Sequence, residues 1–272
     1  MKEAEKEKKL SFWGHLAVLR GHLIRMVMAL VALAIGMFCC KDFIFNRIIL
    51  PPKSGDFITN RWFCLISQKF NIEGICGEEQ TLQIINVNMA GQFTIHIYIS
   101  IMMALIIGAP YLLWEIWRFI KPALKKNEKK YAGRTLFSAS VLFYIGVMFS
   151  YFLIIPITIN FFATYQVSGE VTNMINLNSY ISTVMNLMFA VGLIFELPII
   201  VYFLSKIELI TPTLMKKYRK MMIVAIFVVA AVITPPDVFS QIMVAIPLLV
   251  LYEVSILISA TVRKEKDRKT EI

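Results

Sequence analysis

A single carboxylate lies inside one of the most apolar stretches of the chain. From Val184 to Leu204 run 21 residues whose only polar side chains are Asn186, Glu196 and Tyr202. At about 1.5 Å per residue, a helix of this length crosses a bilayer core of about 30 Å. A carboxylate at that depth costs on the order of 3 kcal/mol and usually faces a cavity or a partner. We therefore expect Glu196 to have an intramembrane function. The alternative is an acid hydrogen-bonded to a neighbouring helix for packing only.

The other residues with reactive or metal-binding side chains are sparse. His15, His22 and His96 are scattered and form no metal site. Cys64 and Cys76 lie in one long loop, where they form a disulfide if the compartment is oxidising; the alternative is two buried thiols. No CxxC spacing occurs, so a catalytic role for these cysteines is disfavoured.

The chain lacks the short motifs of common enzyme classes. It has no GxxxxGK[ST] phosphate loop, no HExxH, no GxSxG and no carboxylate pair within an apolar span. We therefore expect neither an ATPase nor a peptidase, and no enzyme activity or cofactor. Any work that the protein does must come from a gradient, a partner or binding energy.

The composition indicates which class of protein this chain belongs to. Apolar residues make up 58% of the chain and charged residues 17%, which is typical of a polytopic membrane protein. We expect one membrane domain over residues 1–272. The net charge of +10 comes from Lys and Arg that are sorted by loop and not gathered in one patch, so it indicates membrane topology and not nucleic-acid binding.

The apolar runs predict an all-α fold with six transmembrane helices. The predicted spans are about 24–45, 93–113, 135–155, 184–204, 221–234 and 241–259. The fifth has 14 residues and reaches only about 21 Å, and the sixth contains Pro247. Two short helices beside a buried acid favour a locally thinned bilayer.

Basic residues predict the orientation of these spans. Residues 1–25 carry six Lys and Arg, residues 115–134 seven, and residues 205–220 and 260–272 five each, whereas residues 157–183 carry none. Both termini are therefore expected on the cytoplasmic side. The 41–90 loop carries five basic and five acidic residues and is long enough to be translocated to the outer side.

The two ends of the chain carry their own signals. Apolar residues recur at helical spacing in residues 11–23, which predicts an amphipathic helix on the inner membrane surface. Residues 263–272 are predicted to form a basic cytoplasmic tail. The charged amino end precedes an apolar run too long for a signal-peptide core, so we expect the first span to stay as an anchor.

Several runs in order along the chain resemble one family. They are SFWGHLAVLR (residues 11–20), PYLLWEIWRFIKP (110–122) with Glu128 after it, LFYIG (142–146), FELP (195–198) and TPPDVFSQ (234–241). Together they resemble the TatC family, the multi-span receptor subunit of the twin-arginine protein translocase. The resemblance covers nearly the whole chain, and residues 234–241 are its most specific element.

The resemblance implies a cupped protein in the cytoplasmic (inner) membrane of a bacterium. It would receive signal peptides with paired arginines on its cytoplasmic face and export folded proteins at the expense of the proton-motive force. Its partners would be single-span TatA- and TatB-type subunits, the folded substrate proteins, further copies of itself and the lipid bilayer, and no nucleic acid.

The resemblance also assigns roles to residues. Leu19, Arg20, Phe119 and Glu128 would bind the signal peptide, and Glu196 would line the concave intramembrane face. Two further residues, Asp237 and Gln241, would sit in the last outer turn.

Glu128 fits this role on physical grounds as well. It is an acid in a loop crowded with lysines, and a guanidinium pairs bidentately with a carboxylate. The alternative is a surface salt bridge to a neighbouring lysine.

One position departs from the family pattern. The family usually has an acid where this chain has Val18, which puts a receptor site made of two acids in doubt. Glu115, at the predicted cytoplasmic boundary, is the candidate that could compensate. The 53–83 insertion is also longer than the family norm.

Two other functions remain open from the residues alone. A proton-coupled small-solute transporter would use Glu196 as its proton carrier, although the two halves of the chain share no evident repeat. An assembly scaffold would need only packing surfaces.

Overall fold

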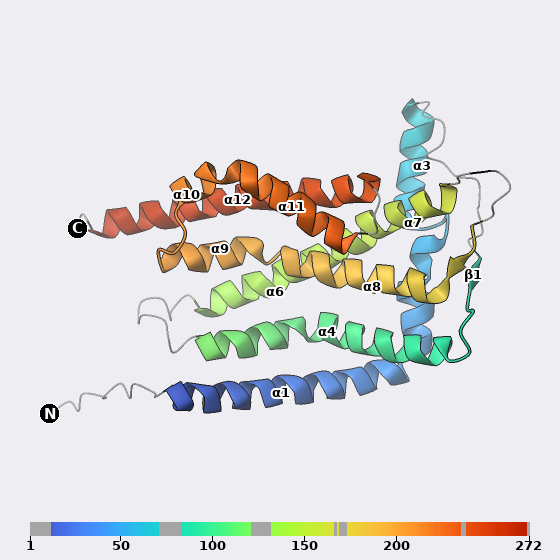
Figure 1. Cartoon of the computed structure of the whole chain (residues 1–272), viewed down its shortest axis with the longest axis horizontal. Helices are drawn as coiled ribbons and strands as arrows, with labels where there is room; N and C mark the ends of the chain where they lie inside the picture. The colour runs from blue at the N-terminus through green and yellow to red at the C-terminus, as the bar shows by residue number, and fades with distance from the viewer. Residues whose placement is uncertain are drawn as a thin grey trace.

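The computed structural model describes residues 12–70, 83–120, 132–165, 168, 173–234 and 238–270, and most of them are helical. The long helices lie side by side along one direction (Figure 1). They are α1 (Phe12–Cys39), α4 (Gly91–Ile120), α6 (Ala132–Phe149), α8 (Leu177–Ile194), α9 (Leu197–Lys206), α11 (Arg219–Ile233) and α12 (Val238–Thr270).

Short elements join the long helices. They are α2 (Lys41–Phe43), the π-helix η1 (Ile44–Ile49), the 3-10 helix η2 (Pro51–Lys53), α3 (Ile58–Phe70), the π-helix η4 (Ser150–Ile154), α7 (Ile155–Thr164) and α10 (Pro212–Lys217). Two residue pairs form a small parallel sheet of β1 (Ile84–Ile85) and β2 (Ile175–Asn176). The hydropathy pattern did not predict this sheet.

Five stretches within the described residues are long and apolar enough to cross a membrane. They are Leu16–Cys39, Gly91–Phe119, Thr135–Thr164, Leu177–Lys206 and Gln241–Lys264. These stretches support a helical multi-span membrane protein. The fifth predicted span, 221–234, coincides with α11, whose 15 residues are short for a membrane crossing. The count of six spans, the cupped shape and the cytoplasmic position of both termini therefore stay predictions.

Helix boundaries differ from the predicted spans at both ends of the chain. Residues 11–23, predicted as a separate interfacial helix, form from Phe12 onward the first part of the continuous helix α1. That helix ends at Cys39, whereas the first span was expected to run to residue 45. At the other end, α12 continues to Thr270 through most of the predicted basic tail. The apolar run marks only the segment long enough to cross the hydrocarbon core of the membrane. Backbone hydrogen bonding can continue the helix into the polar residues on either side.

The predicted span 184–204 is two helices and not one. α8 ends at Ile194, Phe195 and Glu196 form a turn, and α9 begins at Leu197. Pro198 explains the break, because it lacks a backbone N–H and its ring clashes with the carbonyl of residue 194. Proline is favoured in the first turn of a helix, and here it starts α9. Glu196 therefore lies at a helix junction.

The core forms where α8 packs against α6 and α4. Phe143 and Val147 of α6 meet Gly192 of α8, and these residues are buried. At the edges of the bundle, α1 packs on α4, and α12 packs on α9 and α11 (Figure 1).

The insertion after α1 is anchored to the end of the bundle. α3 runs across the direction of the long helices (Figure 1). Phe57 packs against the rings of Tyr151 and Phe152. The hydroxyl of Thr59 donates to the Phe152 carbonyl, and Asn160 Nδ2 donates to Asn60 Oδ1 at 2.8 Å. The described part of the insertion is thus packed onto the third membrane stretch.

Candidate functional site

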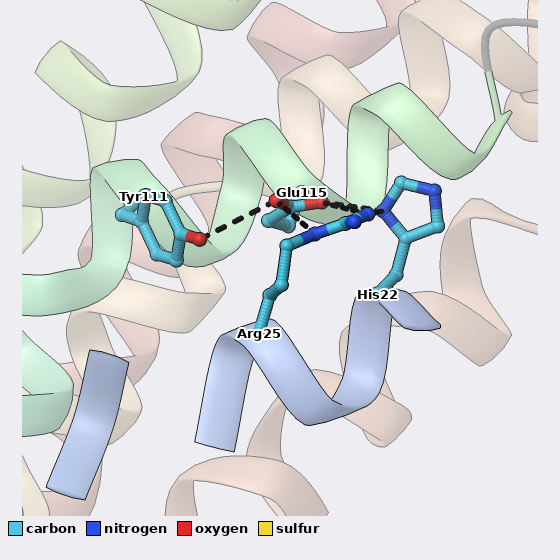
Figure 2. Close-up of polar contacts among 4 residues, drawn as sticks. All are labelled: His22, Arg25, Tyr111 and Glu115. Atoms are coloured by element: carbon cyan, nitrogen blue, oxygen red, sulfur yellow. Dashed lines mark hydrogen bonds and ion pairs between the residues drawn. The ribbon is translucent and has the colours of Figure 1, made fainter. Parts of the chain in front are cut away.

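Glu115 is the centre of a polar cluster between α1 and α4 (Figure 2). Its Oε1 accepts hydrogen bonds from Arg25 Nε at 3.0 Å and from the Tyr111 hydroxyl at 3.3 Å. Its Oε2 accepts from His22 Nδ1 and lies 3.5 Å from Arg25 Nη2. Only 1% of the Glu115 surface is exposed, so water has little access to this carboxylate.

Helical spacing brings the four side chains together. His22 and Arg25 are three residues apart on α1, and Tyr111 and Glu115 are four residues apart on α4. Residues at these separations lie on one face of a helix. Because α1 packs along α4, the two faces meet.

The hydrogen-bonding role of His22 Nδ1 follows from its contacts. An ionised carboxylate only accepts hydrogen bonds, so His22 Nδ1 carries the proton that points to Glu115. Arg25 Nη2 lies 2.9 Å from the same Nδ1. Two donors cannot bond each other, so Arg25 is held chiefly through its Nε bond to Glu115.

Phe119 lies beside this cluster. It follows Glu115 by one helical turn, and its ring meets the His22 ring edge-on, with centroids 6.0 Å apart. Leu19 and Arg20 are exposed on α1, one turn or less before His22. The structure thus brings Phe119 next to the segment that carries Leu19 and Arg20. Glu128 lies outside the described residues.

Sequence reasoning missed the pairing of His22 and Arg25 with Glu115. Sequence reasoning treats Glu115 only as a substitute receptor acid, and His22 only as one of three scattered histidines. The available signal was Arg25 at the start of the first span and Glu115 just beyond the second. Charges at the ends of adjacent spans tend to be paired, although sequence alone does not say with which partner.

Glu196 is buried at the junction of α8 and α9. Only 6% of its surface is exposed, and its Oε1 has no hydrogen-bond partner among the described residues. Its backbone carbonyl accepts from Ile199 and Ile200 and begins α9. Oε1 is therefore a buried polar atom that the described residues leave unsatisfied, which is costly unless a partner supplies the bond.

The candidate residues near the last predicted outer turn are partly described. Gln241 Nε2 donates to the Phe227 carbonyl at 3.0 Å and ties α12 to α11. The buried Thr234 directly follows α11, and its hydroxyl donates to the Ala230 carbonyl at 2.9 Å. Asp237 lies outside the described residues.

Three of the four cysteines lie within the described residues. Cys64 is disulfide-bonded. Cys39 and Cys40 are free and exposed at the end of α1. Cys76 lies outside the described residues, so the pairing of Cys64 with Cys76 stays a prediction.

The comparison with protein-family models identifies the family of this chain. Residues 14–247 match the model described as Sec-independent protein translocase protein (TatC). The chain belongs to the TatC family. The match spans α1, α4 and the junction at Glu196, and extends into α12.

Individual TatC proteins are similar over nearly the whole chain. The TatC of Blattabacterium sp. subsp. Periplaneta americana is 38% identical over 262 residues, which cover 96% of this chain and 98% of that protein. The TatC of Escherichia coli K12 is 32% identical over 245 residues, which cover 90% and 86%. A crystal structure described as the twin arginine translocase receptor TatC superposes with a TM-score of 0.72 at 31% identity, covering 92% of this chain and 99% of that one.

Proposed function

We propose that this TatC protein is the signal-peptide receptor and core subunit of a translocase that exports folded proteins across the cytoplasmic membrane. The observation that carries the proposal is the full-length match to a solved TatC described as a twin arginine translocase receptor, at 31% identity and over 99% of that chain. The five apolar stretches support placement in a membrane.

In this proposal the signal peptide binds at the end of the bundle where α1 meets α4. Glu128 supplies the carboxylate for the paired arginines, because bidentate guanidinium–carboxylate pairs are strong and selective. Phe119 supplies an aromatic surface beside the cluster. Leu19 and Arg20 are exposed on the neighbouring helix, where a peptide can reach them.

The later steps of export would use other surfaces. Glu196 is buried and its Oε1 has no partner in the described part of the chain, which suits a group that bonds to a polar residue of a TatA- or TatB-type single-span partner. Gln241 and Asp237 would act in the last outer turn. The proton-motive force would supply the energy, and both termini would lie on the cytoplasmic side with further copies of the chain in the complex. Family membership supports this translocase over a small-solute transporter with Glu196 as proton carrier.

Site-directed photo-cross-linking in inverted membrane vesicles tests the proposal. A photoreactive phenylalanine analogue at Phe119 should capture a diarginine signal peptide but not a dilysine control. The matched control position is Phe93, which is exposed at the opposite end of the same helix, α4. Capture of both peptides alike, or equal capture at Phe93, would contradict a receptor site at this end of the bundle.

A further inference from the structure

The Glu115 carboxylate is already saturated with donors. Oε1 accepts from Arg25 and Tyr111, and Oε2 accepts from His22 with Arg25 Nη2 close by. A carboxylate offers about four lone-pair positions, and these contacts occupy both oxygens. An incoming arginine could bind Glu115 only by displacing a donor that the chain itself supplies.

Displacement is unfavourable in this place. The Arg25 side chain is 42% exposed, but its partner Glu115 is 1% exposed. A peptide guanidinium would have to enter a closed contact between two helices and leave Arg25 or His22 unpaired. His22 is 7% exposed, so leaving it without a partner costs its full desolvation.

The same bonds hold α1 in place. This helix packs along α4 at the edge of the bundle (Figure 1), and most of its apolar stretch is exposed. In lipid, apolar side chains do not drive helices together, so interhelical polar contacts weigh more in fixing their positions. At the other end of α1, His96 Nε2 donates to the Phe38 carbonyl at 3.0 Å. Polar contacts therefore fasten both ends of α1 to α4.

His22 links this fastening to the proposed peptide site. Its Nδ1 bonds Glu115, and the edge of its ring meets Phe119. Moving His22 would shift both the exposed segment around Leu19 and the surroundings of Phe119. One side chain thus joins the two walls of the site.

We propose that His22, Arg25 and Glu115 are positioning residues that hold α1 and Phe119 as one surface for the signal peptide, and that Glu115 is not a second receptor acid. The inference rests on the proposed receptor function. Glu115 then does not replace the acid that the family usually has at the position of Val18. Glu128 remains the acid that contacts the peptide.

Double-mutant cycles distinguish a positioning residue from a contact. The affinities of the full-length protein in nanodiscs are measured at one fixed salt concentration for diarginine, arginine–lysine and dilysine peptides. Glu115→Gln should weaken every peptide by the same factor, about three- to tenfold, because interhelical hydrogen bonds in membranes are of this strength. Arg25→Gln should weaken binding similarly, and the double variant should be no worse than either single variant.

Two substitutions at His22 separate its two contacts. Asn places a donor where Nδ1 was but has no ring for Phe119, and Phe keeps a ring but donates nothing. His22→Asn and His22→Phe should each retain part of the wild-type affinity for the peptide. His22→Ala, which keeps neither contact, should lose more affinity than these two variants. Glu253→Gln is the matched control, because Glu253 also binds an arginine, Arg219 at 2.7 Å, but in an exposed pair on α11 and α12. It should change affinity by less than about twofold.

The outcomes separate this inference from the proposed function. A Glu115→Gln effect that disappears with the dilysine peptide would show direct contact with arginine and overturn the positioning role, while leaving the receptor function standing. Wild-type affinity in Glu115→Gln and in all three His22 variants would also overturn it. Failure of the wild-type protein to prefer the diarginine peptide would instead count against the receptor function itself.

Discussion

Gly146 of α6 lies directly against Gly192 of α8 where these two helices pack. A Cβ on Gly146 would stand 3.0 Å from the Gly192 Cα and 2.7 Å from Cγ of Phe195. The helices therefore approach each other through two residues without side chains, as is common between membrane helices. Gly192 is four residues before Glu196, so this contact fixes the place of the buried acid at the junction of α8 and α9.

The close approach predicts a packing defect in Gly146→Ala. Both helix backbones limit relaxation, so we expect a loss of about 1 to 3 kcal/mol in the free energy of unfolding. Unfolding in detergent, followed by helical circular dichroism, measures the loss. Gly36→Ala on α1 is the control, because nothing lies within 4 Å of its Cβ position, and alanine there should be neutral or stabilise by up to about 1 kcal/mol. Equal stability of the two variants would contradict the helix contact.

Glu196→Gln should separate stability from function. Glutamine keeps the size of the side chain and replaces the carboxyl group, whose Oε1 has no partner among the described residues, with a neutral amide, so the isolated protein should be as stable as wild type or more stable by about 1 kcal/mol. Signal-peptide binding should be retained and export should fall, because the proposed partner loses its carboxylate. Thermal unfolding, peptide binding and an export assay give the three readings.

Glu196→Ala is the comparison that assigns the effect to the carboxylate. It removes the acid but also leaves a cavity, which carries its own cost. Normal export by both variants would mean that Glu196 serves packing only. Loss of export in Glu196→Ala alone would assign the defect to volume.

The predicted disulfide can be tested by thiol labelling of intact cells. If Cys64 and Cys76 are paired, a membrane-impermeant maleimide should modify neither until a reductant is added. Cys39 and Cys40, which are free and exposed in the structure, are first replaced by serine so that they do not contribute. Immediate labelling at Cys64 and Cys76 would rule out the bond.

The sequence and the structure agree best where one physical signal dominates. Apolar length alone located four of the five membrane stretches to within a few residues at one end or the other. The sequence also places Pro198, a residue that breaks helices, two positions after Glu196. Sequence reasoning did not locate the break itself, because the hydropathy of the run is uninterrupted. It also missed the pairing of Arg25 with Glu115, which are 90 residues apart, since a long-range contact depends on which helices become neighbours. The resemblance to the family supplied Phe119, which neither its spacing nor its apolar character singles out.

Val18→Glu tests the departure from the family pattern. Val18 is 38% exposed on α1, one turn before His22, so a carboxylate can be accommodated without burial. We expect normal insertion and an affinity for the diarginine peptide that is equal to or higher than that of wild type. Weaker binding with intact folding would mean that the segment around Val18 does not face the peptide's arginines.

The central claim is that the chain binds paired arginines through Glu128, and one affinity comparison tests it most directly. Labelled diarginine and dilysine peptides are titrated against the wild type and Glu128→Ala in nanodiscs at one stated salt concentration, because exposed ion pairs weaken with ionic strength. The wild type should prefer the diarginine peptide. Glu128→Ala should lose about 1.5 to 3 kcal/mol, or roughly ten- to a hundredfold in affinity, and with it the preference. Wild-type affinity and preference in Glu128→Ala would contradict the account.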